Sequence, residues 1–164
     1  MVTLQEYLST SYDPDVEYVD GVLVERNVGA WLRSLVQSNL IFGIRSKYPR
    51  VCVVPELRSQ TSPTRYRLPD VCVLLAPPKT KYLLDAALLA IEILSEDDSM
   101  TRMMEKLEEY ERKGVPNIWL FDPRLRKMAV YADGGLTEIR GDRISTTGEP
   151  LLELTREEVF QDLE

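Results

Sequence analysis

Two acidic residues, Asp70 and Glu92, lie at apolar segments where a charged side chain is costly. Asp70 follows Pro69 and opens the apolar run 71–75, and Glu92 lies inside the apolar run 88–94. A carboxylate inside an apolar strand is strongly unfavourable unless something compensates its charge. A shared divalent cation would compensate both carboxylates, so we predict that Asp70 and Glu92 hold one ion.

The ligands available to such an ion are oxygen atoms. Adjacent strands lie about 4.8 Å apart, so two carboxylates aimed at the same end of a sheet can meet at one ion. Oxygen ligands favour Mg²⁺ or Mn²⁺ over zinc, and the backbone carbonyl of Ile93 or Leu94 is a candidate third ligand. Such an ion polarises a phosphate oxygen and lowers the pKa of a bound water, which is the chemistry of phosphodiester cleavage.

A lysine on the next predicted helix completes this group. Lys106 lies at the edge of the apolar stripe of the helix predicted over 99–113, and its aliphatic stem can cross the edge of the core. Its ammonium would stabilise negative charge that develops on the phosphorus centre. We therefore expect the carboxylates of Asp70 and Glu92 to converge, with the ammonium of Lys106 beside them.

Each of these residues also has a simpler interpretation. Asp70 fits an acid that begins a strand after a proline, and Glu92 fits a structural acid paired with an arginine. Lys106 fits a surface lysine at the boundary of the stripe, and Arg102 and Lys113 on the same helix show that position alone does not select it. The pair of acids is therefore more informative than either acid alone.

The composition excludes several kinds of chemistry. The chain has 164 residues, a formal net charge of −7 and no histidine. Without histidine, a Ser-His-Asp triad, a Cys-His pair and a histidine-bound zinc are all impossible. The negative charge argues against a protein that coats nucleic acid, although Arg58, Arg65 and Arg67 form either a local basic strip or a solvated hairpin.

The sequence carries no signal for a membrane or for secretion. No apolar run approaches the roughly 20 residues that span a bilayer, and the N-terminus lacks the pattern of a signal peptide. Cys52 and Cys72 each fall in a predicted strand, so we interpret both as interior thiols. These features predict a cytoplasmic protein with no membrane partner.

The periodicity of apolar residues predicts one α/β domain over residues 1–164. Three helices are expected over 3–9, 28–47 and 99–113, and a short terminal helix begins at 154–158. A hairpin of 16–19 and 22–26 turns at Asp20-Gly21, and a polar loop is expected over 59–64. The remaining strands are expected over 51–57, 68–75, 88–94, 117–121, 127–131 and 136–139.

Five segments together resemble a known family. They are Glu17-Tyr18-Val19-Asp20-Gly21-Val22-Leu23, Leu68-Pro69-Asp70-Val71, Ile91-Glu92-Ile93-Leu94-Ser95, Glu105-Lys106-Leu107-Glu108-Glu109-Tyr110 and the run from Gly114 to Pro123. In this order they resemble the Uma-two family of restriction-endonuclease relatives, part of the PD-(D/E)XK nuclease superfamily. The resemblance covers about residues 3–160, and its most specific part is Glu92 to Pro123.

The resemblance implies a restriction-endonuclease-like core, which is a mixed central β-sheet flanked by helices, with an N-terminal β-hairpin. Asp70 matches the aspartate of the superfamily and Glu92 its second acid. Leu94 stands where the superfamily usually has a lysine, and Lys106 matches a family lysine on the following helix. Glu17 in the hairpin matches another family acid that reaches the same metal.

Two positions depart from the family pattern. Trp31 stands where members often carry a histidine near the start of the first long helix. Arg102 stands where many carry an aspartate one turn before the helical lysine, with Asp97 and Asp98 close by in the sequence. These departures bear on catalytic competence more than on fold.

Three functions are compatible with these observations. The first is a Mg²⁺- or Mn²⁺-dependent endonuclease acting on DNA, and the second is a catalytically degenerate module that binds a protein or nucleic-acid partner. The third is a metal-dependent hydrolase of a small phosphoester, which needs no basic groove. Because a duplex has two strands and two-fold dimers are common, we also expect a homodimer.

Overall fold

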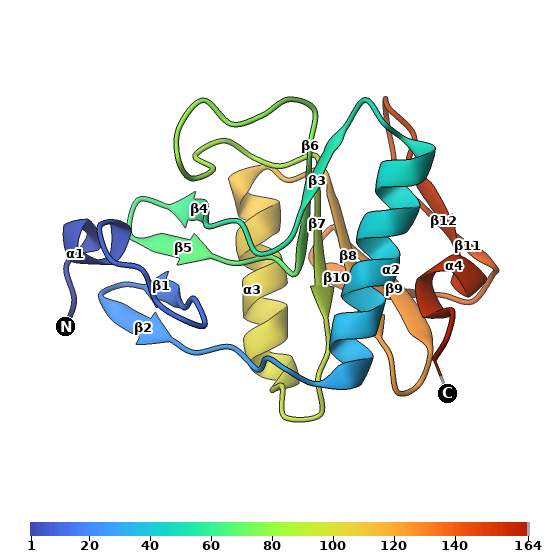
Figure 1. Ribbon diagram of the computed structural model, residues 1–164, viewed down its shortest axis with the longest axis horizontal. Coiled ribbons are helices and arrows are strands. Elements are labelled where there is room, and N and C mark those ends of the chain that lie inside the picture. Colours follow the sequence, from blue (N-terminus) through green and yellow to red (C-terminus); the bar gives the residue numbers. More distant parts are fainter. Residues whose placement is uncertain (164) are drawn as a thin grey trace.

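The structure of the protein is a computed structural model, and it describes residues 1–163 (Figure 1). Its centre is a six-stranded sheet with the order β10-β9-β8-β7-β6-β3, in which only β7 and β8 pair in parallel. These strands are β3 (Cys52–Val54), β6 (Val71–Leu74), β7 (Leu89–Ile93), β8 (Asn117–Asp122), β9 (Lys127–Ala132) and β10 (Gly135–Ile139). The mixed central sheet confirms the predicted α/β fold class.

Helices α2 (Trp31–Lys47) and α3 (Met100–Lys113) cover opposite faces of this sheet. Along β7, Leu89, Ile91 and Ile93 belong to the same core cluster as the buried residues of α2. Ala90 belongs instead to the cluster formed with α3. Since side chains alternate along a strand, Glu92 shares the α3 side with Ala90.

Helix α3 begins and ends where the sequence predicts. The side chain of Ser99 accepts a hydrogen bond from the backbone of Arg102 at the N-terminus, and Gly114 ends the helix with a φ of +101°. Glycine adopts this left-handed conformation without the steric cost that other residues have. The sequence pattern places Met100 in the apolar stripe of this helix, but Met100 is the first helical residue and is 46% exposed.

The N-terminal half forms a second sheet with the order β2-β1-β5-β4, which Figure 1 shows on the left of α3. Its strands are β1 (Glu17–Val19), β2 (Val22–Val24), β4 (Ser59–Ser62) and β5 (Arg65–Arg67). The hairpin of β1 and β2 was predicted, whereas β4 lies where a loop was expected. The polar sequence of β4 shows no apolar alternation, and its pairing with β5 decides its conformation.

A short N-terminal helix, a two-stranded sheet and a short terminal helix complete the fold. Helix α1 (Leu4–Leu8) begins with a capping box between Thr3 and Glu6, and its Tyr7 packs against Tyr18 and Tyr66 of the second sheet. Strands β11 (Arg143–Ser145) and β12 (Glu153–Thr155) form a two-stranded sheet. Helix α4 (Arg156–Phe160) follows, so the terminal helix begins two residues later than predicted.

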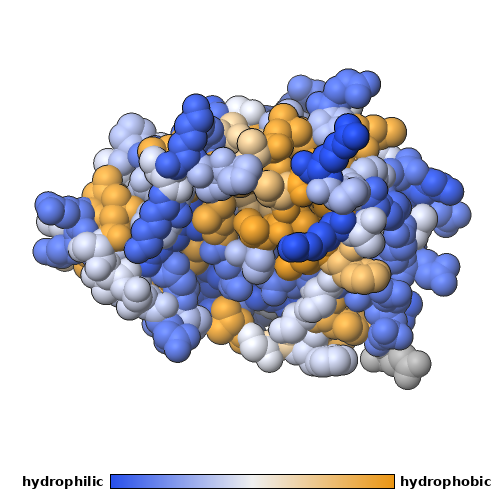
Figure 2. Space-filling model, turned by 45° about the horizontal axis from the view of Figure 1, so that its top comes forward, coloured by the Kyte–Doolittle hydropathy of each residue, from blue (hydrophilic) through white to orange (hydrophobic). Residues whose placement is uncertain are grey.

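The surface is mostly hydrophilic. On the face seen in Figure 2, apolar side chains gather near the middle with hydrophilic side chains around them. The loop between β6 and β7 carries two exposed leucines, Leu75 and Leu84. No helix among residues 1–163 has the length and apolar character that crossing a membrane requires. Cys52 and Cys72 are both free thiols, and burial raises the pKa of Cys72 to about 12.

Candidate active site

The five residues that the sequence singled out border one cavity of about 640 Å³. They come from the first hairpin, from the ends of two central strands and from α3: Glu17, Asp70, Glu92, Ile93 and Lys106. Every one of the four titratable side chains is at most 8% exposed. The fold therefore gathers in one place residues that lie up to 89 positions apart in the chain.

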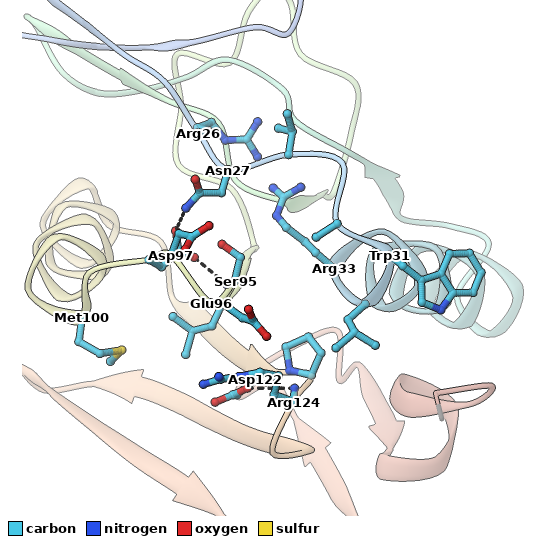
Figure 3. Close-up of a pocket in the computed structure, with 16 residues that line it drawn as sticks. Arg26, Asn27, Trp31, Arg33, Ser95, Glu96, Asp97, Met100, Asp122 and Arg124 are labelled. Atoms are coloured by element: carbon cyan, nitrogen blue, oxygen red, sulfur yellow. Dashed lines mark hydrogen bonds between the residues drawn. The ribbon is translucent and has the colours of Figure 1, made fainter.

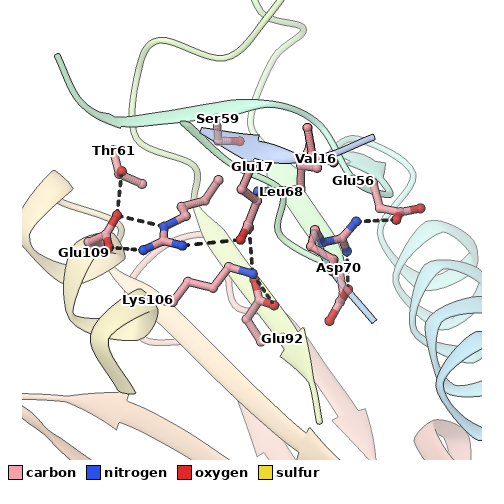
Figure 4. Close-up of polar contacts among 12 residues, drawn as sticks. Val16, Glu17, Glu56, Ser59, Thr61, Leu68, Asp70, Glu92, Lys106 and Glu109 are labelled. Atoms are coloured by element: carbon pink, nitrogen blue, oxygen red, sulfur yellow. Dashed lines mark hydrogen bonds and ion pairs between the residues drawn. The ribbon is translucent and has the colours of Figure 1, made fainter. Parts of the chain in front are cut away.

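Lys106 lies between two buried carboxylates (Figure 4). Its Nζ is 2.7 Å from Oε2 of Glu17 and 3.2 Å from Oε1 of Glu92. The alternation along β7 turns Glu92 towards α3, and Lys106 faces it from that helix. The interpretation of Lys106 as a surface lysine is wrong, and the cationic partner of Glu92 is this lysine rather than an arginine.

Tyr110 is a partner of Glu92 that sequence reasoning missed. Its hydroxyl donates a hydrogen bond of 2.7 Å to Oε2 of Glu92. Burial and the charge of Glu92 raise the pKa of Tyr110 well above its usual value, so its hydroxyl keeps its proton. The sequence signal was available, because Tyr110 lies four residues after Lys106 and so on the same face of α3.

Glu17 connects the first hairpin to this group. It accepts a hydrogen bond of 2.8 Å from the backbone amide of Leu68, and Nη1 of Arg67 lies 3.4 Å from its Oε1. Burial alone would raise the pKa of Glu17, but the charges of Lys106 and Arg67 outweigh it and hold the pKa below its usual value. Glu17 is therefore a carboxylate that is charged in the folded protein.

A second buried acid, Glu109, holds Arg67 in place. Its carboxylate accepts hydrogen bonds from Nε of Arg67 at 3.0 Å, from Nη1 of Arg65 at 2.8 Å and from Oγ1 of Thr61 at 3.0 Å. Although burial opposes its charge, these partners hold the pKa of Glu109 below its usual value. Contacts therefore run from Glu109 through Arg67 and Glu17 to Lys106, and Figure 4 labels Glu109, Glu17 and Lys106 in this group.

The arginine cluster is neither a free basic strip nor a solvated hairpin. Arg58 is 3% exposed, lies 4.0 Å from the ring centre of Tyr7 and donates hydrogen bonds to both carboxylate oxygens of Asp15. Arg67 is 7% exposed and pairs with Glu109. Both expectations are wrong because the second sheet folds these side chains inward, where acids compensate them.

Asp70 has a different set of partners from Glu92. Its Oδ1 accepts hydrogen bonds from Nη2 of Arg26 at 2.7 Å and from Nη2 of Arg33, and its Oδ2 accepts one of 2.6 Å from the amide of Ile93. Within residues 1–163, no hydrogen bond or ion pair joins Asp70 to Glu17, Glu92 or Lys106. We expected the two carboxylates to converge with the ammonium of Lys106 beside them; both acids border one cavity, but Lys106 pairs with Glu92 and Asp70 has separate partners.

The donor atoms fit a hard divalent cation. Asp70 and Glu92 supply carboxylates at the border of one cavity, where Ile93 offers a backbone carbonyl. Magnesium is commonly held by one or two carboxylates together with water and substrate phosphate. Three or more acidic, histidine or cysteine side chains that could hold a metal do not come together anywhere in residues 1–163. Asp70, Glu92 and the carbonyl of Ile93 stay the predicted ligands of such an ion.

A second cavity of about 710 Å³ adjoins the first (Figure 3). Arg26, Arg33 and Asp97 border both cavities. Ser95 lines the second cavity, and its buried hydroxyl is without a hydrogen-bond partner in the described residues. Trp31, at the rim, is 68% exposed. The predicted acids therefore lie at one end of a longer hollow rather than in an isolated pocket.

The chain is similar to a protein of known structure and to one protein family. No curated protein matches the chain. A crystal structure of a "putative nuclease belonging to DUF820" from Anabaena variabilis is 24% identical, covers 100% of both chains and superposes with a TM-score of 0.83. A complex of DrdV with DNA is 12% identical, with a TM-score of 0.39 over 65% of this chain and 12% of that chain.

The likeness to the Anabaena protein confirms the fold over the whole chain. The sequence of the chain also matches a family model, in agreement with the resemblance of the five segments. The match to the Uma2 family, described as "Putative restriction endonuclease", runs over residues 4–162, so the chain belongs to that family.

Proposed function

We propose that this protein is an endonuclease that hydrolyses phosphodiester bonds of DNA and depends on Mg²⁺ or Mn²⁺. The observation that carries the proposal is the common cavity of Glu17, Asp70, Glu92 and Lys106. Membership of the Uma2 family supports the same reaction class. Asp70, Glu92 and the carbonyl of Ile93 would hold the ion, which when bound would polarise the phosphate and make a water more acidic.

The chain's own residues supply the remaining steps. The ammonium of Lys106 stabilises negative charge that develops on the phosphate oxygens as the bond to the nucleophile forms. Glu17 and Glu92 together position that ammonium through their ion pairs with it. Tyr110 donates to Glu92 and fixes the orientation of its carboxylate. Because these groups are buried and hydrogen-bonded, they are preorganised before substrate binds.

Cleavage of supercoiled plasmid with Mg²⁺ or Mn²⁺ tests this proposal. We expect nicked and linear products from the wild-type protein and none from Asp70→Asn or Glu92→Gln, which keep the shape of each side chain. Lys127→Ala is the matched control, because Lys127 forms only a loose surface pair with Glu138 at 3.8 Å. Absence of cleavage of supercoiled, linear and single-stranded DNA with either metal contradicts the proposal.

A second candidate is a catalytically degenerate module that binds a partner. The observation that favours it is the pairing of Asp70 with two arginines, because guanidinium groups already compensate the carboxylate. Binding of DNA without cleavage in the plasmid assay would support this candidate. Turnover of a chromogenic phosphodiester without cleavage of DNA would instead support a small-molecule hydrolase.

The assembly that we infer is a homodimer, as expected for cutting two strands. Helix α2 offers a surface for it, because Trp31 and Phe42 are 68% and 67% exposed and lie three turns apart on one face. Sedimentation equilibrium tests the inference: the wild type should sediment as a dimer, and the double variant Trp31→Ser, Phe42→Ser as a monomer. A wild-type monomer at tens of micromolar would contradict it.

A further inference from the structure

We propose that Arg33 is an exchangeable partner of Asp70: it compensates the carboxylate before a divalent cation binds, and it then leaves Asp70 to bind a DNA phosphate. The inference rests on the proposed nuclease function and extends it to a residue outside the predicted site. It assigns to Arg33 two roles in turn, in place of a purely structural ion pair.

The carboxylate of Asp70 already accepts several hydrogen bonds in the structure. An ionised carboxylate offers about four lone-pair directions. Three are used: Arg26 and Arg33 both donate to Oδ1, and the amide of Ile93 donates to Oδ2. A further cation at Asp70 meets two guanidinium charges at the same oxygen, and like charges in a buried site repel strongly. Binding of a cation at Asp70 therefore requires that at least one guanidinium group moves away.

The second step identifies which arginine moves. Arg26 has a second acidic partner, since its Nη1 lies 2.6 Å from Oε1 of Glu56, and this contact anchors it. The only ion pair that Arg33 forms within residues 1–163 is the one with Asp70. Arg33 is thus held by Asp70 alone and is the group that a new cation releases.

The third step is where the released group goes. Arg33 borders both the 640 Å³ cavity and the adjoining 710 Å³ cavity, so open space lies next to its guanidinium. Figure 3 shows its side chain extending from the start of α2 towards Arg26 at the border of the second cavity. A guanidinium group binds phosphate through two parallel hydrogen bonds. The released side chain therefore lies beside the candidate site with the chemistry that a phosphate backbone needs.

The experiment compares Arg33→Gln with Arg45→Gln. Both variants remove one positive charge from α2, but Arg45 is exposed in the last turn of the helix, far from Arg33 in the sequence. Binding of Mn²⁺ alone is measured by titration with detection of free Mn²⁺ by electron paramagnetic resonance. Binding of a labelled duplex is measured by fluorescence anisotropy in Ca²⁺, at several salt concentrations.

The exchange predicts effects of opposite sign. Arg33→Gln should bind Mn²⁺ about 10-fold or more tightly than the wild type, because a competing charge is gone. The same variant should bind the duplex more weakly, with a slope of log affinity against log salt that is reduced by about 1. Arg45→Gln should bind Mn²⁺ as the wild type does. A purely structural role for Arg33 would weaken both kinds of binding.

Two results overturn the inference: Mn²⁺ binding by Arg33→Gln that is equal to or weaker than that of the wild type, and an unchanged salt slope. If Arg33→Gln does not fold by circular dichroism, Arg33→Lys is tested instead, and its ammonium should give a smaller change of the same signs. The plasmid assay with the wild type decides the proposed function separately. If the wild type cleaves the plasmid but Arg33→Gln binds Mn²⁺ with wild-type affinity, the exchange is refuted and the proposed function stands.

Discussion

Replacing Lys106 by methionine tests whether this side chain is the cation that allows two acids to be buried together. Lys106→Met keeps most of the aliphatic stem and removes the ammonium. Glu17 and Glu92, each 2% exposed, then face one another without the charge between them. We expect the folded state to become much less stable near pH 7.

The size of the effect follows from the two distances. At an effective dielectric constant of about 20, attraction at 2.7 Å is worth about 6 kcal/mol and attraction at 3.2 Å about 5 kcal/mol. Desolvation of three buried charges cancels much of this gain. Removing one member of a buried ion pair typically costs about 3–5 kcal/mol. For a chain of this length, that corresponds to a melting temperature lower by roughly 10 °C.

The loss should also depend on pH. The charge of Lys106 is the largest contribution that lowers the pKa of Glu17, and burial opposes it. In the variant, only Arg67 and the amide of Leu68 still oppose the effect of burial, so we expect the pKa of Glu17 to rise and the carboxylate to take up a proton at a higher pH than in the wild type. Protonation removes the repulsion, and the difference in stability between variant and wild type should therefore shrink between pH 7 and pH 5.

Urea unfolding monitored by circular dichroism at pH 7 and pH 5 measures both effects. The double variant Lys106→Met, Glu17→Gln should recover part of the loss, because it removes one of the two unpaired charges. Lys127→Met is the control, and its exposed pair with Glu138 predicts a change below about 1 kcal/mol. A loss below about 1 kcal/mol for Lys106→Met, or a loss independent of pH, would refute the reasoning.

Four further outcomes are expected from the same contacts. Tyr110→Phe, which removes only the hydroxyl bonded to Glu92, should cost about 1.5–3 kcal/mol in urea unfolding. Gly114→Ala places a side chain at a φ of +101° and should cost about 1 kcal/mol in thermal unfolding. The pKa values of Glu17 and Glu109 are lower in the folded protein than their usual value of 4.5, so the stability that they contribute is complete above pH 4.5 and is lost as the pH falls below it. Glu109→Gln should destabilise the protein at pH 7 by about 3 kcal/mol, and a titration of stability below pH 4.5 should be flatter in this variant than in the wild type.

The amino-acid sequence by itself determined the strands of the central sheet and the two long helices, although α2 begins three residues later than the predicted start at 28. Apolar runs such as that of β7 and the glycine at position 114 that ends α3 act over a few neighbouring positions, so a pattern along the chain identifies them, whereas the cap of α3 is Ser99, the residue predicted to be the first of that helix. The five family segments also identified the residues that border the cavity. The pairing of Asp70 with Glu92 was predicted from their place in apolar segments, whereas Glu17 and the choice of Lys106 over its neighbours rested on the resemblance.

Only the tertiary structure decided which charged side chains form ion pairs with one another. The pairing of Lys106 with Glu17 and Glu92, and of Arg33 with Asp70, joins residues from separate elements. Strand β4 likewise forms because β5 lies beside it. Electrostatic and hydrogen-bond energies depend on the distance between two side chains, and they are large only within a few ångströms. The packing of sheets and helices fixes these distances, and no short pattern in the sequence specifies that packing.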